Sequence, residues 1–137
     1  MAAIPVGAKG EHRITVHDGV AIDFLGTDDA RVLGTPYLIA FLEMTSRDLV
    51  KPMLGPGKDT VGTHVDVRHL AATPIGMEVR FEAEVIEVDE PRIRFRVKAF
   101  DEHEKIAEGT HERYIIDIER FAGRVRGKAA GQVRPGQ

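Results

Sequence analysis

The sequence predicts an α+β fold in which a long antiparallel sheet wraps around one central helix. Two observations support this fold class. A single apolar segment, residues 35–51, has helix signals at both ends, and the second half of the chain alternates apolar and polar residues as β-strands do. The 137 residues are enough for one hydrophobic core and too few for two separate ones. We therefore expect a single folded domain.

The N-terminal part of the chain shows weaker strand signals. Residues 14–24 alternate loosely and contain Asp18-Gly19, a pair typical of turns. This stretch is expected to form one strand followed by a second short strand or a turn. Residues 26–29, which read Gly-Thr-Asp-Asp, are then expected to form a loop.

The helix has clear boundary residues. Thr35 is a residue type that caps helices, Pro36 fits the first helical position, and Pro52 limits the end of the helix. Residues 37–42 contain no charged side chain, so the first turns are apolar nearly all round. Such a helix is expected to be enclosed by other elements rather than laid on a surface.

The strands of the second half follow one another as a meander. In residues 77–85 and 92–99 the apolar positions alternate with a mainly acidic row and a basic row respectively, and Asp89-Glu90-Pro91 lies between them. Opposite charges across a hairpin favour antiparallel pairing. Residues 63–69 precede this hairpin as a strand, and residues 105–118 are expected to complete the sheet.

Composition excludes several classes of protein. Hydrophobic residues make up 42% of the chain and charged residues 30%, as in soluble globular proteins. No apolar run approaches the roughly 18 residues of a membrane span, and residues 1–9 lack the layout of a secretory signal, so a cytoplasmic location is expected. The formal charge of -3 gives no broad attraction to nucleic acid or to a membrane. The absence of cysteine excludes a thiol nucleophile and a disulfide scaffold.

Basic residues gather near the C-terminus, where glycines interrupt them: Arg120, Arg124, Arg126, Lys128 and Arg134. This composition is typical of a solvated end of the chain. The expected organisation is one domain over residues 1–126 and a flexible tail over residues 127–137. The alternative is that these basic side chains contact the phosphates of a nucleotide-bearing substrate.

Three polar residues are candidates for chemistry. Glu43 is the only charge between Tyr37 and Ser46, and burying an unpaired carboxylate is costly; the alternative is a helix edge that faces solvent. His69 shares a strand face with apolar residues, where an imidazole could transfer protons near neutral pH; the alternative is a core histidine bonded to a backbone carbonyl. Thr35 has the strongest structural alternative of the three, because Thr before Pro at a helix start is ordinary capping.

Four short motifs carry a resemblance to a known family: Gly34-Thr35-Pro36, Leu42-Glu43-Met44, the run from Val67-Arg68-His69 to Thr73-Pro74, and Gly109-Thr110-His111-Glu112-Arg113. Over residues 14–126 the chain resembles the hot-dog-fold thioesterases related to fluoroacetyl-CoA thioesterase. This resemblance implies a hot-dog fold and a catalytic group made of Thr35, Glu43 and His69. It also implies that Gly62 and Arg113 line the acyl end of the substrate pocket.

One segment departs from the family pattern. The fluoroacetyl enzyme covers its small acyl pocket with phenylalanines just before the helix, whereas residues 26–31 here read Gly-Thr-Asp-Asp-Ala-Arg. This argues against fluoroacetyl as the acyl group and leaves thioester hydrolysis as the expected reaction.

The expected function is that of an acyl-CoA thioesterase that hydrolyses a small or medium acyl-CoA without metal or cofactor. No spacing of the remaining histidines suggests a metal site. Thr35 and Glu43 would lie about 12 Å apart along one helix, so either Thr35 sits in a bend folded toward Glu43 or residues of two subunits assemble the site. The resemblance to hot-dog proteins, which commonly dimerise by extending the sheet edge to edge, implies a homodimer, and such pairing would also cover an open sheet edge. The alternatives are a non-catalytic acyl-CoA or thioester-binding protein and a hot-dog hydratase or dehydratase; the latter is disfavoured because no closely spaced Asp and His open the helix.

Overall fold

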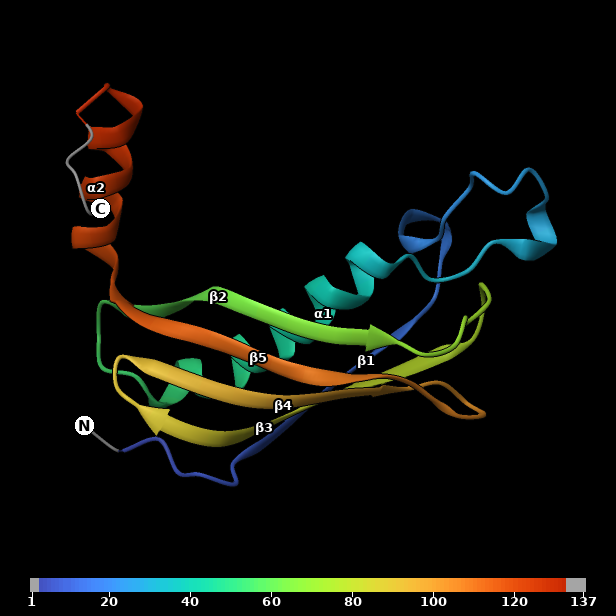
Figure 1. The fold of residues 1–137 in the computed structure, drawn as a ribbon, viewed down its shortest axis with the longest axis horizontal. Helices are drawn as coiled ribbons and strands as arrows, with labels where there is room; N and C mark the ends of the chain where they lie inside the picture. The colour runs from blue at the N-terminus through green and yellow to red at the C-terminus, as the bar shows by residue number, and fades with distance from the viewer. Residues whose placement is uncertain (1–2, 133–137) are drawn as a thin grey trace.

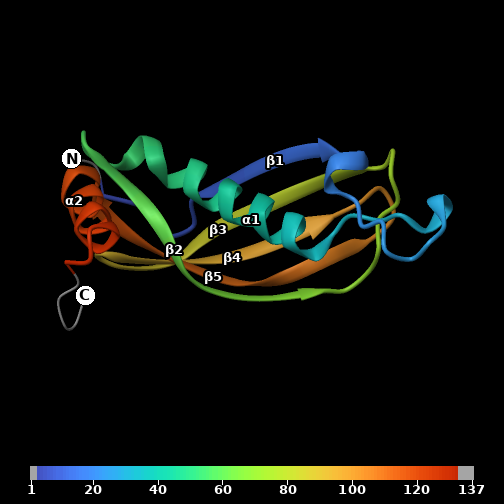
Figure 2. The same ribbon diagram turned by 90° about the horizontal axis from the view of Figure 1, so that it is seen from above.

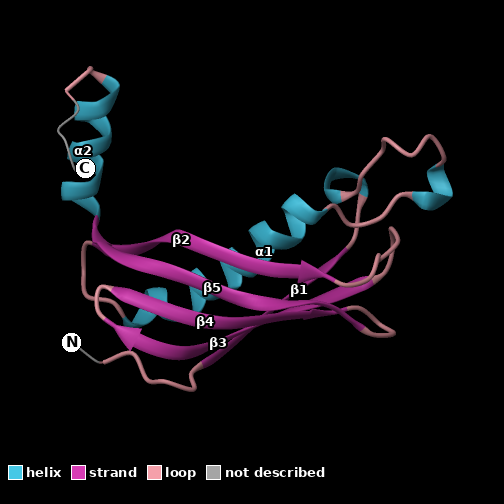
Figure 3. Ribbon diagram, viewed as in Figure 1, coloured by secondary structure: helices cyan, strands magenta, loops and turns pink. Residues whose placement is uncertain are grey.

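The structure, a computed structural model, describes residues 3–132. It contains one sheet and two helices (Figures 1 and 3). The strands are β1 (Lys9–Thr15), β2 (Lys58–His69), β3 (Glu78–Asp89), β4 (Arg92–Phe100) and β5 (Lys105–Asp117); the helices are α1 (Thr35–Val50) and α2 (Ile118–Ala129). The five strands pair antiparallel in the order β1-β3-β4-β5-β2. Helix α1 crosses one face of this sheet (Figure 2), which confirms the expected α+β class.

The predicted hairpin and meander are confirmed. Strands β3 and β4 pair antiparallel, with Glu82 opposite Lys98 and Glu84 opposite Arg96. The second pair forms an exposed ion pair, with 3.6 Å between a guanidinium nitrogen of Arg96 and the Glu84 carboxylate. Strand β5 follows β4 in the sheet, so three consecutive strands are neighbours.

The hydrophobic core lies between the sheet and one face of α1. Leu38, Leu42 and Val50 of the helix are buried with aromatic residues of the sheet, Phe81 and Phe95 among them. The expectation that the helix is enclosed on all sides is wrong for the single chain. Tyr37 and Met44 are 44% and 43% exposed, because the sheet covers only one side of α1. An apolar strip of the helix therefore lies open in the isolated chain.

The first strand lies earlier than expected. Residues 9–15 form β1, so only its last two residues fall in the stretch expected to hold a strand, whereas the short 3₁₀ turn at residues 18–20 agrees with the turn expected at Asp18-Gly19. The inward positions of β1 include Gly10, whose missing side chain makes room for Leu49: a Cβ there would lie 3.1 Å from the Leu49 Cβ. A glycine and a histidine on the inner face hide the alternation that identifies a strand.

Helix α2 replaces the beginning of the expected flexible tail. The side chain of Asp117 caps it by accepting a hydrogen bond from the Arg120 N–H at 3.0 Å, and Gly131, at a φ of +82°, follows its end. The boundary expected at residue 126 thus falls inside a helix, and residues 133–137, including Arg134, lie outside the described part of the chain. Within residues 3–132, neither helix is long and apolar enough to cross a membrane.

Candidate active site

The start of α1 places the Thr35 hydroxyl against His69. Gly34, not Thr35, is the N-cap residue, and the Gly34 N–H is bonded to the Val20 carbonyl at 2.9 Å. The expected capping role of Thr35 is therefore wrong. Its Oγ1 instead lies 2.8 Å from Nδ1 of His69, the last residue of β2. The helix start and the strand end are joined by a hydrogen bond between two side chains that can exchange a proton.

His69 is half-buried, and burial is the main reason that its pKa is lowered from the ordinary value of 6.5; a backbone hydrogen bond at Ala71 opposes the shift. The ring is consequently neutral at pH 7. Its Nε2 is buried and has no hydrogen-bond partner among the described residues. Because buried polar atoms are nearly always paired, this nitrogen is suited to bind a group that the isolated chain does not contain.

Glu43 lies farther along α1, against the backbone of β2. A Cβ at Gly62 would lie only 2.6 Å from Oε1 of Glu43, so the carboxylate fills the space that the glycine leaves. The side chain is half-buried, and no hydrogen bond or ion pair within residues 3–132 engages it. It lines an open cavity of about 400 Å³ whose other walls include Arg47, Gly62 and Arg113. The carboxylate is thus neither enclosed in the core nor fully in solvent.

Arg113 is held in place on the other side of Gly62. Its guanidinium donates to the side-chain and backbone oxygens of Thr60 at 2.7 and 2.9 Å, and its third nitrogen lies 3.1 Å from Nε2 of His111. Nδ1 of His111 is 2.8 Å from the carbonyl of His64, which can only accept, so Nε2 carries no proton and accepts from Arg113. Burial lowers the pKa of Arg113, while the charge of Glu43 raises it. A buried cation is thereby fixed beside the carboxylate.

Three of these residues were not among the sequence candidates. Thr60 and His111 orient Arg113, and the position of His111 on the same strand face as Arg113 was the available signal. Arg47 joins α1 to β2 beside Glu43 through a two-pronged contact with Asp59, at 3.1 and 2.7 Å. The Arg47 guanidinium lowers the pKa of Asp59 to about 2.

The candidate residues form two clusters in one chain. Thr35 and His69 lie together at the start of α1, and Glu43, Gly62 and Arg113 lie together two turns farther along. Eight residues of helix separate the two clusters by about 12 Å along the axis. A single chain therefore does not bring Glu43 and His69 to the same atom.

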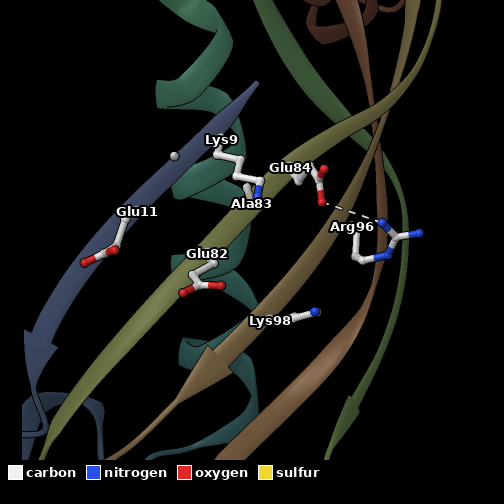
Figure 4. Close-up of a pocket in the computed structure, with 8 residues that line it drawn as sticks. Lys9, Glu11, Glu82, Ala83, Glu84, Arg96 and Lys98 are labelled. Atoms are coloured by element: carbon white, nitrogen blue, oxygen red, sulfur yellow. Dashed lines mark ion pairs between the residues drawn. The ribbon is translucent and has the colours of Figure 1, made fainter. Parts of the chain in front are cut away.

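Another cavity, of about 410 Å³, lies on the face of the sheet that points away from α1 (Figure 4). Its charged lining comes from β1, β3 and β4: Lys9, Glu11, Glu82, Glu84, Arg96 and Lys98. It contains no histidine and no hydroxyl group, and Glu84 and Arg96 pair with each other across it. This lining lacks the groups of a hydrolytic site, so the α1 side of the sheet remains the candidate.

Comparison with known proteins shows which family the chain is similar to. The model of the fluoroacetyl-CoA-specific thioesterase family matches residues 14–119. The chain is 38% identical over 97 residues to the fluoroacetyl-CoA thioesterase of Streptantibioticus cattleyicolor, which covers 71% of this chain and 70% of that enzyme.

Solved structures agree with this match. The structure of the fluoroacetyl-CoA thioesterase superimposes with a TM-score of 0.85 at 31% identity, covering 93% of this chain and 98% of that one. A variant of that enzyme with a phenylalanine replaced by alanine, in complex with fluoroacetate and CoA, gives a TM-score of 0.79 at 31% identity, covering 86% and 99%. A thioesterase superfamily member from Thermus thermophilus gives a TM-score of 0.87 at 26% identity, covering 96% and 97%. These matches confirm the hot-dog fold.

Proposed function

This chain belongs to the family of fluoroacetyl-CoA-specific thioesterases and is an acyl-CoA thioesterase, and from that premise we propose that it hydrolyses small or medium acyl-CoA thioesters at sites shared between two subunits. The observation that carries the proposal is the Thr35–His69 hydrogen bond of 2.8 Å together with the unpaired, buried Nε2 of His69. In each site, Thr35 and His69 come from one subunit and Glu43 comes from the other.

The edge of the sheet supports this assembly. Strand β2 is at one end of the strand order, and its residues 62–66 are exposed, with Val65 at 39%. Two β2 strands pairing antiparallel about a two-fold axis at Asp66 would place Gly62 of one subunit beside His69 of the partner subunit, because the bulge between Gly62 and His64 adds one residue to the count. Such pairing also removes an open edge that invites aggregation. The homodimer then brings the two clusters together.

The chemistry follows from the groups present. Glu43 either attacks the thioester carbonyl directly, forming an anhydride that water then opens, or takes a proton from the water that attacks the carbonyl. In both cases the C–S bond breaks and CoA leaves as a thiolate. Neutral His69 takes the proton that water releases and returns it to that thiolate. Thr35 positions the His69 ring and polarises the thioester with the N–H groups at the start of α1. Arg113, held by Thr60 and His111, fixes positive charge near the acyl end beside Gly62. Hydrolysis in H₂¹⁸O under single turnover tests direct attack: water that opens the anhydride at the Glu43 carbonyl leaves labelled oxygen in the Glu43 carboxylate, whereas general-base catalysis labels only the product acid.

Subunit complementation tests the shared site. Glu43→Gln and His69→Gln are each expected to be inactive alone. Mixing them with subunit exchange gives heterodimers in half of the molecules, each with one intact site out of two, so about a quarter of the parental activity returns. If the mixture stays inactive while both variants are folded dimers, the shared site is wrong. If the parent turns over no acyl-CoA across a range of chain lengths, the alternative of a non-catalytic thioester-binding protein is favoured.

A further inference from the structure

Helix α2 carries an apolar stripe and a set of basic side chains that the rest of the chain leaves uncovered. At 100° per residue, Ile118, Phe121, Ala122 and Val125 fall on one side of the helix. Ile118 and Val125 are 42% and 52% exposed, and no residue of α2 is buried. Such a helix is suited to pack against another surface. It also contains four basic residues that form no ion pair within residues 3–132: Arg120, Arg124, Arg126 and Lys128.

The loop end of the sheet, made of residues 70–76 after β2 and residues 101–104 between β4 and β5, has the complementary character. Two of its apolar side chains, Leu70 and Ile75, are 48% and 42% exposed. Residues 101–104 also carry three carboxylates that pair with no cation in the described part of the chain: Asp101, Glu102 and Glu104. The loop end therefore offers exposed apolar surface beside unpaired negative charge.

Hydrogen bonds connect the loop end to the candidate catalytic residues of its own chain. Its first residue follows His69 directly. The Thr73 carbonyl accepts a hydrogen bond of 2.9 Å from the N–H of Leu33, which lies two residues before Thr35. The Thr73 hydroxyl donates to Asp101 at 2.9 Å and so joins the two segments of the loop end. A contact made with the loop end would therefore support both partners of the Thr35–His69 hydrogen bond.

The two-fold axis proposed at Asp66 brings these two surfaces together. Counted from this axis, with the bulge in β2 included, Lys58 of one subunit arrives level with Thr73 of the partner subunit. Lys58 is the first residue of β2, and α2 begins beside it, because the Ile118 N–H donates to the Gly57 carbonyl at 2.9 Å. The start of α2 therefore lies next to the loop end of the partner subunit.

The direction and length of α2 also fit this surface. In Figure 1, α2 rises beyond the β2 edge at the left, whereas the loop end lies at the right; Figure 2 places them at opposite ends as well. Its 12 residues span about 18 Å. In the joined sheet, β5 and β4 of the partner subunit lie about 10 and 14 Å beyond the β2 edge, so the second half of α2 reaches the level of the turn that joins them. Residues 17–31 of the partner subunit, which project beyond the edge as α2 does, are carried to the other side of it.

We propose that α2 docks on the loop end of a second copy of this chain, with its apolar stripe on Leu70 and Ile75 and its basic side chains facing the carboxylates of residues 101–104. This contact rests on the homodimer proposed above and extends its interface beyond β2. Opposite charge, exposed apolar residues on both surfaces and continuity with the paired edge all select this occupant.

The contact joins the same two subunits that share one active site. Glu43 and α2 come from one subunit, and the Thr35–His69 pair and the loop end come from the other. A helix seated on the loop end would restrict the backbone that holds this pair in position opposite Glu43. The basic side chains of α2 would then serve the subunit contact rather than the phosphates of CoA.

Cysteine cross-linking tests the contact directly, because the natural chain has no cysteine. Ala122→Cys and Ile75→Cys are prepared as separate proteins, mixed to exchange subunits and treated with a short bismaleimide. The expected product is a covalent Ala122→Cys/Ile75→Cys heterodimer that contains most of the exchanged protein. The matched control is Ala122→Cys mixed with Phe24→Cys. Phe24 is 77% exposed but lies in residues 17–31, so this pair is expected to give no more than background cross-linking.

Charge reversal tests the electrostatic part of the contact. Arg124→Glu is expected to raise the dissociation constant of the dimer at least about threefold, because it places like charges together. Adding Glu104→Arg to the same chain should restore the dimer, since each contact then joins opposite charges again. Arg13→Glu, an exposed residue of β1 at the other edge of the sheet, is the control and should leave the dissociation constant unchanged. Sedimentation equilibrium measures all four proteins.

Other outcomes overturn the inference in different ways. An Ala122→Cys protein that cross-links to itself would show that two α2 helices pair with each other. A dimeric, active parent without the heterodimer cross-link would refute this contact and leave the proposed function standing, whereas a monomeric active parent would refute the shared site as well. If Arg124→Glu raises KM for acyl-CoA but not for the matching N-acetylcysteamine thioester, which lacks the nucleotide, with dimerisation unchanged, α2 binds CoA phosphates instead.

Discussion

The hydroxyl oxygen of Thr35 lies 2.8 Å from Nδ1 of His69. One ring nitrogen is thus held by a residue at the helix start, and the other, Nε2, stays buried and unpaired among the described residues. Because a hydroxyl can donate a hydrogen bond to Nδ1 or accept one from it, the contact holds the orientation of the ring and leaves Nε2 free to contact a bound group. We therefore expect Thr35 to act on the chemistry through the orientation of His69.

Substitution of Thr35 should reveal this role. Thr35→Ser keeps the hydroxyl and is expected to lower kcat less than about tenfold, whereas Thr35→Ala should lower it by about a hundredfold, the usual effect of losing a proton-transfer arrangement. Release of CoA, measured with a thiol reagent, gives kcat directly. Thr110→Ala, on the outer face of the sheet, is the control and should behave as the parent. Full activity in Thr35→Ala would reduce Thr35 to a structural residue.

Glu43 and His69 are expected to work as one unit. Glu43→Ala and His69→Ala should each lower kcat/KM by a similarly large factor, and the double variant should lose little more, because groups that act together are not additive. The kinetics of the two single variants and the double variant provide the measurement. Losses that multiply would show independent roles. If His69→Ala keeps its activity but loses stability, His69 belongs to the core and Glu43 needs another partner.

Gly62→Ala should impair catalysis without unfolding the protein. Its Cβ would lie 2.6 Å from Oε1 of Glu43, the end of a flexible side chain that can move away, so the carboxylate is displaced rather than the backbone. We expect kcat/KM to fall at least about tenfold, with a change of less than about 1 kcal/mol in the free energy of unfolding. Thermal unfolding and steady-state kinetics measure the two effects.

Two other glycines are useful controls for Gly62→Ala. A Cβ at Gly109 would lie 2.0 Å from the carbonyl oxygen of Asp66, so Gly109→Ala should fail to fold stably. A Cβ at Gly123 meets nothing within 4 Å, so Gly123→Ala in α2 should leave activity intact and slightly favour the helix. A Gly62→Ala protein with normal activity would place Glu43 outside the catalytic group.

Acid should weaken the contact between Arg47 and Asp59. The pKa of Asp59 is lowered to about 2 in the folded protein, from 3.8, so the unfolded chain binds its proton first as the pH falls. The stabilisation is complete above about pH 4 and is lost as the pH falls toward 2. Asp59→Asn should therefore lower the free energy of unfolding at pH 7 by about 1–3 kcal/mol and have less effect at pH 2. Denaturant unfolding of the parent and of Asp59→Asn at the two pH values measures these changes in the free energy of unfolding. An equal decrease at both pH values would show that the lost stability does not come from the ion pair.

Sequence reasoning succeeded where one periodicity dominated. The apolar alternation in β3 and β4 and their opposite outer charges predicted a hairpin that the structure contains. It failed for β1, whose inner face includes Gly10 and His12, and for α2, where three glycines within and just after the helix concealed the stripe of Ile118 and Val125. Local patterns do not report what a residue contacts across the sheet.

In the candidate site, too, some features could be predicted from the sequence and others could not. The inward direction of His69 could be read from its strand, but its hydrogen bond to Thr35 could not, because that contact depends on where β2 ends relative to α1. Likewise, the hydrogen bond that orients Arg113 is accepted by Thr60, which lies 53 positions away in the chain. Such contacts depend on how β2 lies against α1 and on its pairing with β5, which no short segment specifies.

That pairing also has a kinetic consequence. Strands β3, β4 and β5 follow one another through short turns, whereas β2 reaches β5 only after the chain closes a loop of roughly 50 residues between partners such as Gly62 and Arg113. The meander should form first during folding, and β2, which carries one residue of each cluster, should add later. Hydrogen exchange pulsed during refolding should protect the amides of β4 before those of β2; the reverse order would contradict this sequence. Newly made chains would then acquire a stable core before they acquire thioesterase activity.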